Sequence, residues 1–154
     1  MTTETSLEIV QMVLQNATNP EIVKSLCSED FRYVSLAYNN PDLAKVMPWA
    51  GTHDGFMGLV NTFRGVNRWW SVDAFEPEAA FTDGEHVAIF GSFTLTSRRL
   101  KKTYTSPFAV FAKVKNGQIA YMQYMEDTLG TAATFRSEGS WTFQGDPDGA
   151  DTKV

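Results

Sequence analysis

The 154-residue sequence contains one cysteine, two histidines and no long hydrophobic run. Because a single cysteine, Cys27, cannot form an internal disulfide, the sequence favours a reducing compartment. No apolar run approaches the ~20 residues that a membrane helix needs, and the first ten residues lack the basic start and apolar stretch of a signal peptide. These absences predict a cytoplasmic protein that does not cross a membrane.

Positive charge is scarce as well, with 13 Lys and Arg residues against 18 Asp and Glu residues and a net charge of −5. A nucleic-acid partner needs a basic footprint, so none is expected. The one basic cluster, residues 98–102, is predicted to be a solvated hairpin tip. His53 and His86 lie far apart and show no metal-ligand spacing, and no glycine-rich phosphate loop is present. The sequence therefore predicts no nucleic-acid partner, no metal and no cofactor.

What the sequence does have is a strong hairpin signal at Asn116-Gly117. Both residues tolerate the positive φ that a two-residue type I′ turn requires. The strand before the turn, around residues 107–112, is apolar on both faces, which indicates that both faces are covered. The strand after it carries Tyr121, Tyr124 and Glu126, a mixed set that suits a pocket wall.

Periodicity and turn residues predict helices over 6–16, 20–27 and from residue 56 onward, with strands over 31–37, 70–81 and 86–97 before the hairpin. Asp127 precedes a last short helix and is predicted to cap its N-terminus rather than to act in catalysis. This order predicts one α+β domain over residues 1–136, with a curved antiparallel sheet and helices on its concave face. Residues 137–154 are acidic and rich in turn residues, and are predicted to be a partly disordered extension.

Three local motifs carry a resemblance to a known family: PWAGTHDG before the third helix, KNGQI at the last turn and EDT at the end of the last strand. With the element order, they resemble the SnoaL-like, ketosteroid isomerase-like branch of the nuclear transport factor 2 superfamily. The resemblance implies a cone-shaped fold that encloses a deep apolar pocket. It also implies that the family's acid and base positions fall on Ser35, Val110 and Tyr124, none of which is a carboxylate.

Two other side chains remain as candidate bases. His53 precedes the third helix and has an ordinary pKa suited to acid–base chemistry. Glu126 shares the side of its strand with Tyr124; a salt bridge at the pocket rim is its alternative role. Tyr124 and Tyr33 are candidate hydrogen-bond donors. The pocket wall is predicted to consist of Phe31, Tyr33, Ser35, Trp49, Phe63, Trp70, Phe108, Val110 and Tyr124.

These features and the resemblance predict a protein that binds a hydrophobic small molecule of the steroid, polyketide or aromatic type, either as a binding protein or as a weak isomerase or cyclase. The alternative is a non-catalytic accessory or protein-interaction module of the same fold. The chain is also expected to form a homodimer through the convex face of its sheet. The predicted contact consists of Ala109, Phe111, Tyr121 and Met125, extended by Phe93 and Leu95 on the neighbouring strand.

Overall fold

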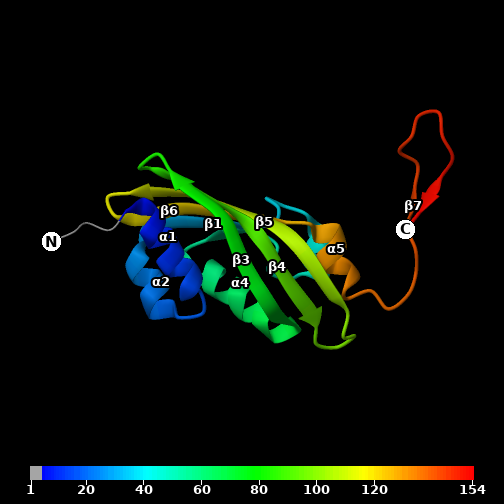
Figure 1. The fold of residues 1–154 in the computed structure, drawn as a ribbon, viewed down its shortest axis with the longest axis horizontal. Coiled ribbons are helices and arrows are strands. Elements are labelled where there is room, and N and C mark those ends of the chain that lie inside the picture. The colour runs from blue at the N-terminus through cyan, green and yellow to red at the C-terminus, as the bar shows by residue number, and fades with distance from the viewer. Residues whose placement is uncertain (1–4) are drawn as a thin grey trace.

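The computed structural model describes residues 5–154, which form a curved six-stranded sheet with helices on one face (Figure 1). The helices are α1 (Ser6–Gln15), α2 (Pro20–Leu26), α3 (Pro41–Val46), α4 (Phe56–Trp69) and α5 (Thr128–Ala133). The strands of the sheet are β1 (Cys27–Ser35), β2 (Gly51–Asp54), β3 (Trp70–Thr82), β4 (His86–Ser97), β5 (Thr103–Lys115) and β6 (Gln118–Glu126). Two further strands, β7 (Thr142–Phe143) and β8 (Thr152–Lys153), form a separate ribbon.

The sheet has the strand order β2-β1-β6-β5-β4-β3. Strands β3 to β6 form the antiparallel meander that the turn signals predict. Strand β1, however, runs parallel to β6, so the sheet is mixed rather than wholly antiparallel. Helices α1, α2 and α4 lie on its concave face (Figure 1), which confirms the predicted α+β layout.

Local chemistry explains where the elements begin and turn. Thr5 and Glu8 form the expected capping box, in which the Thr5 hydroxyl accepts a hydrogen bond from the Glu8 amide at 3.2 Å. The Glu8 carboxylate in turn accepts from the Thr5 amide at 2.9 Å, so two free amides of α1 are satisfied. Asn116 and Gly117 both have positive φ, 52° and 74°, which confirms the predicted type I′ turn between β5 and β6.

The segment between β1 and α4 contains structure where a loop was predicted. Asn40 caps the short helix α3, and residues 51–54 add the edge strand β2 to β1. Tyr33 on β1 pairs with His53 on β2. This pairing fixes where His53 lies, as described below.

The convex face of the sheet exposes a set of apolar side chains. Phe81, Phe90, Phe111 and Met125 are between 39% and 56% exposed. The prediction that Phe93 and Leu95 extend this patch is wrong, because both are buried on the concave face, at 4% and 2% exposure. The register of β4 on β5 places Phe90 opposite Ala109, so Phe90 takes their place on the convex side.

Pairing of two copies through the convex face stays a prediction. Replacing Phe111 with Lys is expected to halve the mass of the assembly, because a charge would have to be desolvated at the centre of the contact. Light scattering at about 1 µM and in high salt measures the mass, because a second, salt-sensitive contact between copies would not contribute under these conditions. Met57→Lys is the matched control, since Met57 is 37% exposed and lies on α4, on the other face of the sheet. An unchanged mass in the Phe111→Lys chain would contradict the prediction.

The C-terminal ribbon lies beyond α5. Thr142 pairs with Lys153 and Phe143 pairs with Thr152, and every side chain from residue 137 to residue 154 is exposed. Figure 1 shows the ribbon projecting away from the sheet and its helices. Within residues 5–154, none of the helices is long and apolar enough to cross a membrane.

Candidate functional site

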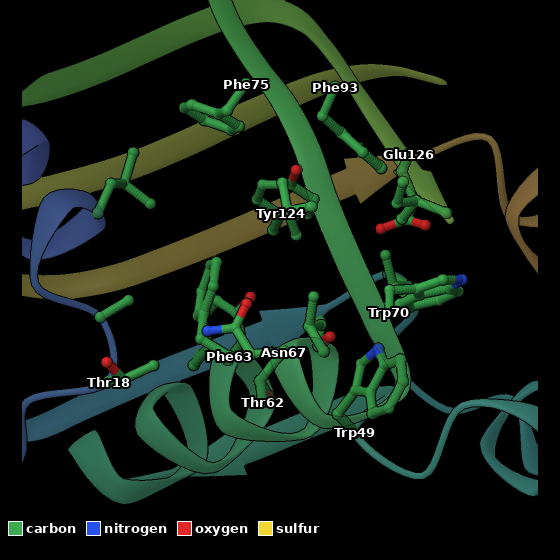
Figure 2. Close-up of a pocket in the computed structure, with 18 of the residues that line it drawn as sticks. Thr18, Trp49, Thr62, Phe63, Asn67, Trp70, Phe75, Phe93, Tyr124 and Glu126 are labelled. Atoms are coloured by element: carbon green, nitrogen blue, oxygen red, sulfur yellow. The ribbon is translucent and has the colours of Figure 1, made fainter. Parts of the chain in front are cut away.

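A cavity of about 340 Å³ lies between the concave face of the sheet and helices α1 and α4 (Figure 2). Strand parity puts alternate residues of β1, β4 and β6 into its wall, and residues 62–67 of α4 contribute the opposite side. Its lining residues are Leu14, Gln15, Ala17, Thr18, Tyr33, Ser35, Leu36, Trp49, Thr62, Phe63, Val66, Asn67, Trp70, Val72, Phe75, Phe93, Leu95, Tyr124 and Glu126.

Tryptophans form one end of the cavity. The Trp49 ring meets the Trp70 ring edge-on, with centroids 5.3 Å apart. Trp70 also stacks on Phe135, and its indole nitrogen donates a hydrogen bond of 2.8 Å to the Thr134 hydroxyl. The buried indole therefore keeps its one polar group satisfied, and the wall at this end is rigid and apolar.

Stacked aromatic rings support the middle of the cavity. Tyr124 lies parallel to Phe108 at 5.7 Å, and Phe108 lies against Phe75 at 4.7 Å. Phe63 of α4 meets Tyr124 edge-on at 6.2 Å from the other side. Such rings give the cavity wall an aromatic surface, which offers a large contact area at low cost in side-chain entropy.

Glu126 brings a carboxyl group into this apolar space. Figure 2 shows it at the end of the cavity where Trp49 and Trp70 lie, next to Tyr124. Its Oε2 atom is buried and has no hydrogen-bond partner among residues 5–154. Burial raises the pKa of Glu126 from 4.5 to about 7, although the Thr131 hydroxyl acts in the opposite direction. The predicted alternative, a salt bridge at the rim, is wrong because no cation of the described chain contacts this carboxylate.

Two tyrosines accompany Glu126. Burial raises the pKa of Tyr124 well above its usual 10, and the negative charge of Glu126 acts in the same direction. Burial likewise raises the pKa of Tyr33, against a smaller opposing effect of Ser35, and the charge of Glu126 raises it further. Both phenols therefore stay protonated at neutral pH and can donate hydrogen bonds. The cavity thus combines one carboxyl group that titrates near neutrality with two hydroxyl donors.

The residue after Glu126 is turned away from the cavity by the start of α5. The Asp127 carboxylate accepts a hydrogen bond of 3.1 Å from the Gly130 amide, which confirms its predicted role as the N-cap. Its other oxygen accepts from the Tyr104 hydroxyl, and the Asp127 amide donates to Ser106 at 3.0 Å. These bonds fix the chain direction at the end of β6, and with it the position of Glu126.

Asp127→Asn is expected to leave stability nearly unchanged, because Asn also caps helices well, whereas Asp127→Ala is expected to lower stability by about 1 kcal/mol. Urea unfolding of the two variants and the parent measures both effects. Equal destabilisation by Asn and Ala would show that the charge of Asp127, rather than its capping oxygen, matters.

The structure brings most of the predicted pocket residues together. Those that line the cavity are Tyr33, Ser35, Trp49, Phe63, Trp70 and Tyr124. Phe31, Phe108 and Val110 do not: all three are buried in the core outside the lining. For Phe108 the reason is its position between the rings of Tyr124 and Phe75, which cover it.

His53, the other candidate base, lies outside the cavity. It lines a separate hollow with Pro48, and its Nε2 atom lies 2.7 Å from the Trp49 carbonyl oxygen. Helix α4 closes over it, since a Cβ at Gly58 would lie 2.2 Å from the His53 Cβ. Val110 has no titratable group and Ser35 no basic one, so Glu126 is the candidate base that the cavity contains.

Several lining residues were missed in the sequence. Gln15 and Thr18 of the α1–α2 region, and Thr62 and Asn67 of α4, place polar groups in the wall. Figure 2 shows Thr18 at the end opposite Glu126. Helical spacing offered a signal for α4, because Val66 and Asn67 lie three and four residues after Phe63 and so share its face. Among the described residues, no three His, Cys, Asp or Glu side chains gather as a metal site would need.

Comparison with known proteins supports this assignment of the fold. No family model matches the chain. Among solved structures, an NTF2-like protein of Burkholderia thailandensis is similar with a TM-score of 0.72 and 23% identity, over 86% of this chain and 98% of that one. TerC, crystallised with polyporic acid, has a TM-score of 0.64 and 20% identity, over 82% of this chain and 95% of that one. These likenesses show the NTF2-like fold.

Two curated fungal proteins are more similar in sequence. Patulin synthesis protein F of Aspergillus clavatus is 41% identical over 146 residues, which span 91% of this chain and 74% of that protein. Patulin biosynthesis cluster protein F of Penicillium expansum is 38% identical over 151 residues, 94% of this chain and 76% of that protein. The chain therefore belongs to the family of patulin synthesis protein F, and its fold is NTF2-like.

Proposed function

We propose that this protein is an isomerase- or cyclase-type enzyme that moves a proton on a small molecule held in the cavity. One observation carries the proposal: the Glu126 carboxyl group is buried in the cavity wall, its Oε2 atom has no hydrogen-bond partner in the described chain, and its pKa is raised to about 7. A group that titrates near the working pH is the most effective general acid or base, and the unpartnered Oε2 atom is free to act on a ligand.

The residues around Glu126 supply the hydrogen-bond donors that such a reaction needs. When ionised, Glu126 accepts a proton from a carbon next to a ligand carbonyl, and the electron pair moves onto the carbonyl oxygen. The hydroxyl of Tyr124 or Tyr33 stabilises that oxygen by donating a hydrogen bond, since both remain protonated at neutral pH. Glu126 then returns the proton at another carbon. The step needs no cofactor, because substrate and product have the same composition.

The cavity favours a compact, flat ligand with oxygen atoms at its ends. Its volume of about 340 Å³ suits one small organic molecule, and the aromatic walls suit a ring. Polar groups at opposite ends, Glu126 and Thr18, fix the orientation of a ligand with more than one oxygen. The curated relatives are named for the synthesis of patulin, and TerC was crystallised with polyporic acid, which together favour a biosynthetic intermediate of the polyketide or aromatic type over a steroid.

Deuterium uptake tests the proposal even while the substrate is unidentified. The protein is incubated in D₂O with a panel of cyclic enones, quinones and lactones, and nuclear magnetic resonance detects exchange at carbons next to the carbonyl. Native mass spectrometry of the purified protein narrows the panel by the mass of any ligand that it retains. We expect exchange with the parent and a loss of about 10²–10⁴-fold in the Glu126→Gln variant.

The outcome also separates the enzyme from a non-catalytic accessory module. A ligand that binds the parent and Glu126→Gln alike, with no exchange in either, would assign the protein to binding alone. Exchange that persists in Glu126→Gln would remove Glu126 from the reaction.

A further inference from the structure

A second hollow of about 490 Å³ lies next to the cavity, at the tip between β4 and β5. Its floor is apolar, and contains Trp69 and Phe135, whose rings meet edge-on at 5.5 Å. Its rim carries four cations. We call this hollow the basic groove; it is lined by Lys45, Val46, Arg68, Trp69, Arg98, Arg99, Leu100 and Phe135.

Within residues 5–154, close ion pairs do little to neutralise the basic groove, although the carboxylate of Asp73 is near enough to Arg98 to interact with its charge. Lys45 lies 3.9 Å from Asp42, and both side chains are exposed, so this contact contributes little. Arg68, Arg98 and Arg99 have no acid within ion-pair distance among the described residues. In a chain with a net charge of −5, such a concentration of cations over aromatic rings fits a partner that is both acidic and apolar.

The C-terminal ribbon is both acidic and apolar. Trp141 and Phe143 are 60% and 43% exposed, and their rings contact each other at 5.8 Å with no other aromatic ring beside them. The loop that joins β7 and β8 carries the acids Asp146, Asp148 and Asp151. An isolated two-stranded ribbon is only marginally stable in water, so the ribbon gains order from a surface on which to pack.

We propose that the basic groove receives the acidic ribbon of a second copy of this chain. The ribbon does not fill the basic groove of its own chain. Its two ends, Trp141 and Val154, line a neighbouring hollow on α5, which shares Val46 and Phe135 with the basic groove. From there the ribbon projects away from the body (Figure 1). The basic groove and the start of the ribbon are adjacent. Two copies related by a two-fold axis can therefore each place the ribbon in the groove of the other, which gives a closed dimer.

The proposed contact joins aromatic and charged pairs. Trp141 and Phe143 pack on the floor with Trp69 and Phe135, and the ribbon's aspartates meet Arg98 and Arg99. Tryptophan and arginine are the residues that contribute most to protein interfaces when they are desolvated together. Since the charges at the rim stay partly in water, the association weakens as salt is raised.

Charge reversal with rescue by mixing tests the exchange. Every chain carries Phe111→Lys, so that pairing through the convex face does not contribute to the mass. The groove variant adds Arg98→Glu and Arg99→Glu, and the ribbon variant adds Asp146→Lys and Asp148→Lys. Each variant alone sets like charges against each other in both contacts. When the two variants are mixed, both contacts of the pair join opposite charges. One contact joins an unchanged groove to an unchanged ribbon, and the other joins the glutamates of the groove variant to the lysines of the ribbon variant.

Sedimentation velocity at about 100 µM and low salt is expected to give a pair for the Phe111→Lys chain, single chains for each variant alone and a pair for the mixture, lost again in high salt. Lys24→Glu with Lys115→Glu is the control, since it changes the net charge as the groove variant does and is expected to leave the pair intact. Single chains in the Phe111→Lys protein, or a mixture that stays single, would overturn the proposal. Protection of the ribbon from proteolysis in a single chain would instead assign the groove to the chain's own ribbon, and would also overturn it.

Discussion

The Glu126→Gln variant is expected to be more stable than the parent at pH 8, by about 2–3 kcal/mol, and nearly equal to it at pH 4. The reason is the raised pKa of Glu126, about 7 in the folded chain against 4.5 in the unfolded chain. Between these two values the folded chain keeps a proton that the unfolded chain has released. The free energy of unfolding of the parent therefore falls as the pH rises through this window, whereas a neutral amide at the same position has no such dependence.

Thermal unfolding from pH 4 to pH 8 measures the difference, which corresponds to a rise of roughly 5–10 °C in Tm at pH 8 for a chain of this size. Glu76→Gln is the control, because Glu76 is an exposed acid on β3 and its replacement should leave the pH dependence unchanged. Parallel curves for the parent and Glu126→Gln would mean that the carboxyl group is solvated and is not the base of the reaction. We therefore expect Glu126→Gln both to gain stability at pH 8 and to lose the deuterium exchange at the ligand carbon.

Trp70→Ala is expected to lower the free energy of unfolding by about 3–5 kcal/mol. Trp70 is 1% exposed and packs against Trp49 and Phe135, so its removal opens a hole between the sheet, α4 and α5. It also leaves the Thr134 hydroxyl without its indole donor. Because Trp70 lines the ligand cavity, ligand binding should weaken together with stability.

Trp141→Ala is the matched control for this loss, since Trp141 is 60% exposed on the ribbon. At low protein concentration and in high salt, where the proposed ribbon contact between copies does not form, its effect on the unfolding of the domain should stay within about 0.5 kcal/mol. Urea unfolding followed by circular dichroism compares the two, because this signal does not depend on the indole that is removed. Similar curves for Trp70→Ala and the parent would show that the core relaxes to fill the hole.

Much of the fold follows from local signals in the sequence. The turn at Asn116-Gly117 and the caps at Thr5, Asn19 and Asp127 act over a few residues, so they can be recognised whatever the rest of the chain does. Strand parity correctly placed Glu126 beside Tyr124 on the cavity side. What the sequence did not show is that the Oε2 atom of Glu126 is buried without a hydrogen-bond partner, since this depends on every element that surrounds it.

The sequence predictions are wrong where contacts between distant segments determine the position of a residue. Strand β2 is four residues long and exists through its pairing with β1, which is separated from it by α3. His53 therefore stood in the sequence only as a candidate base before the third helix, whereas β2 and α4 hold it outside the cavity. Strand β4 is apolar at both parities, so the sequence did not distinguish the side of Phe93 from the side of Phe90; the register on β5 does.

The tryptophan cluster gives the protein a fluorescence signal of its own. Three of the four tryptophans, Trp49, Trp69 and Trp70, lie within one cluster, and two of them line the cavity. The fourth, Trp141, lies on the ribbon, away from this cluster, and is 60% exposed. In a Trp141→Phe chain all indole emission would come from the cavity end, so ligand entry could be followed by quenching, without a label and before any reaction is known.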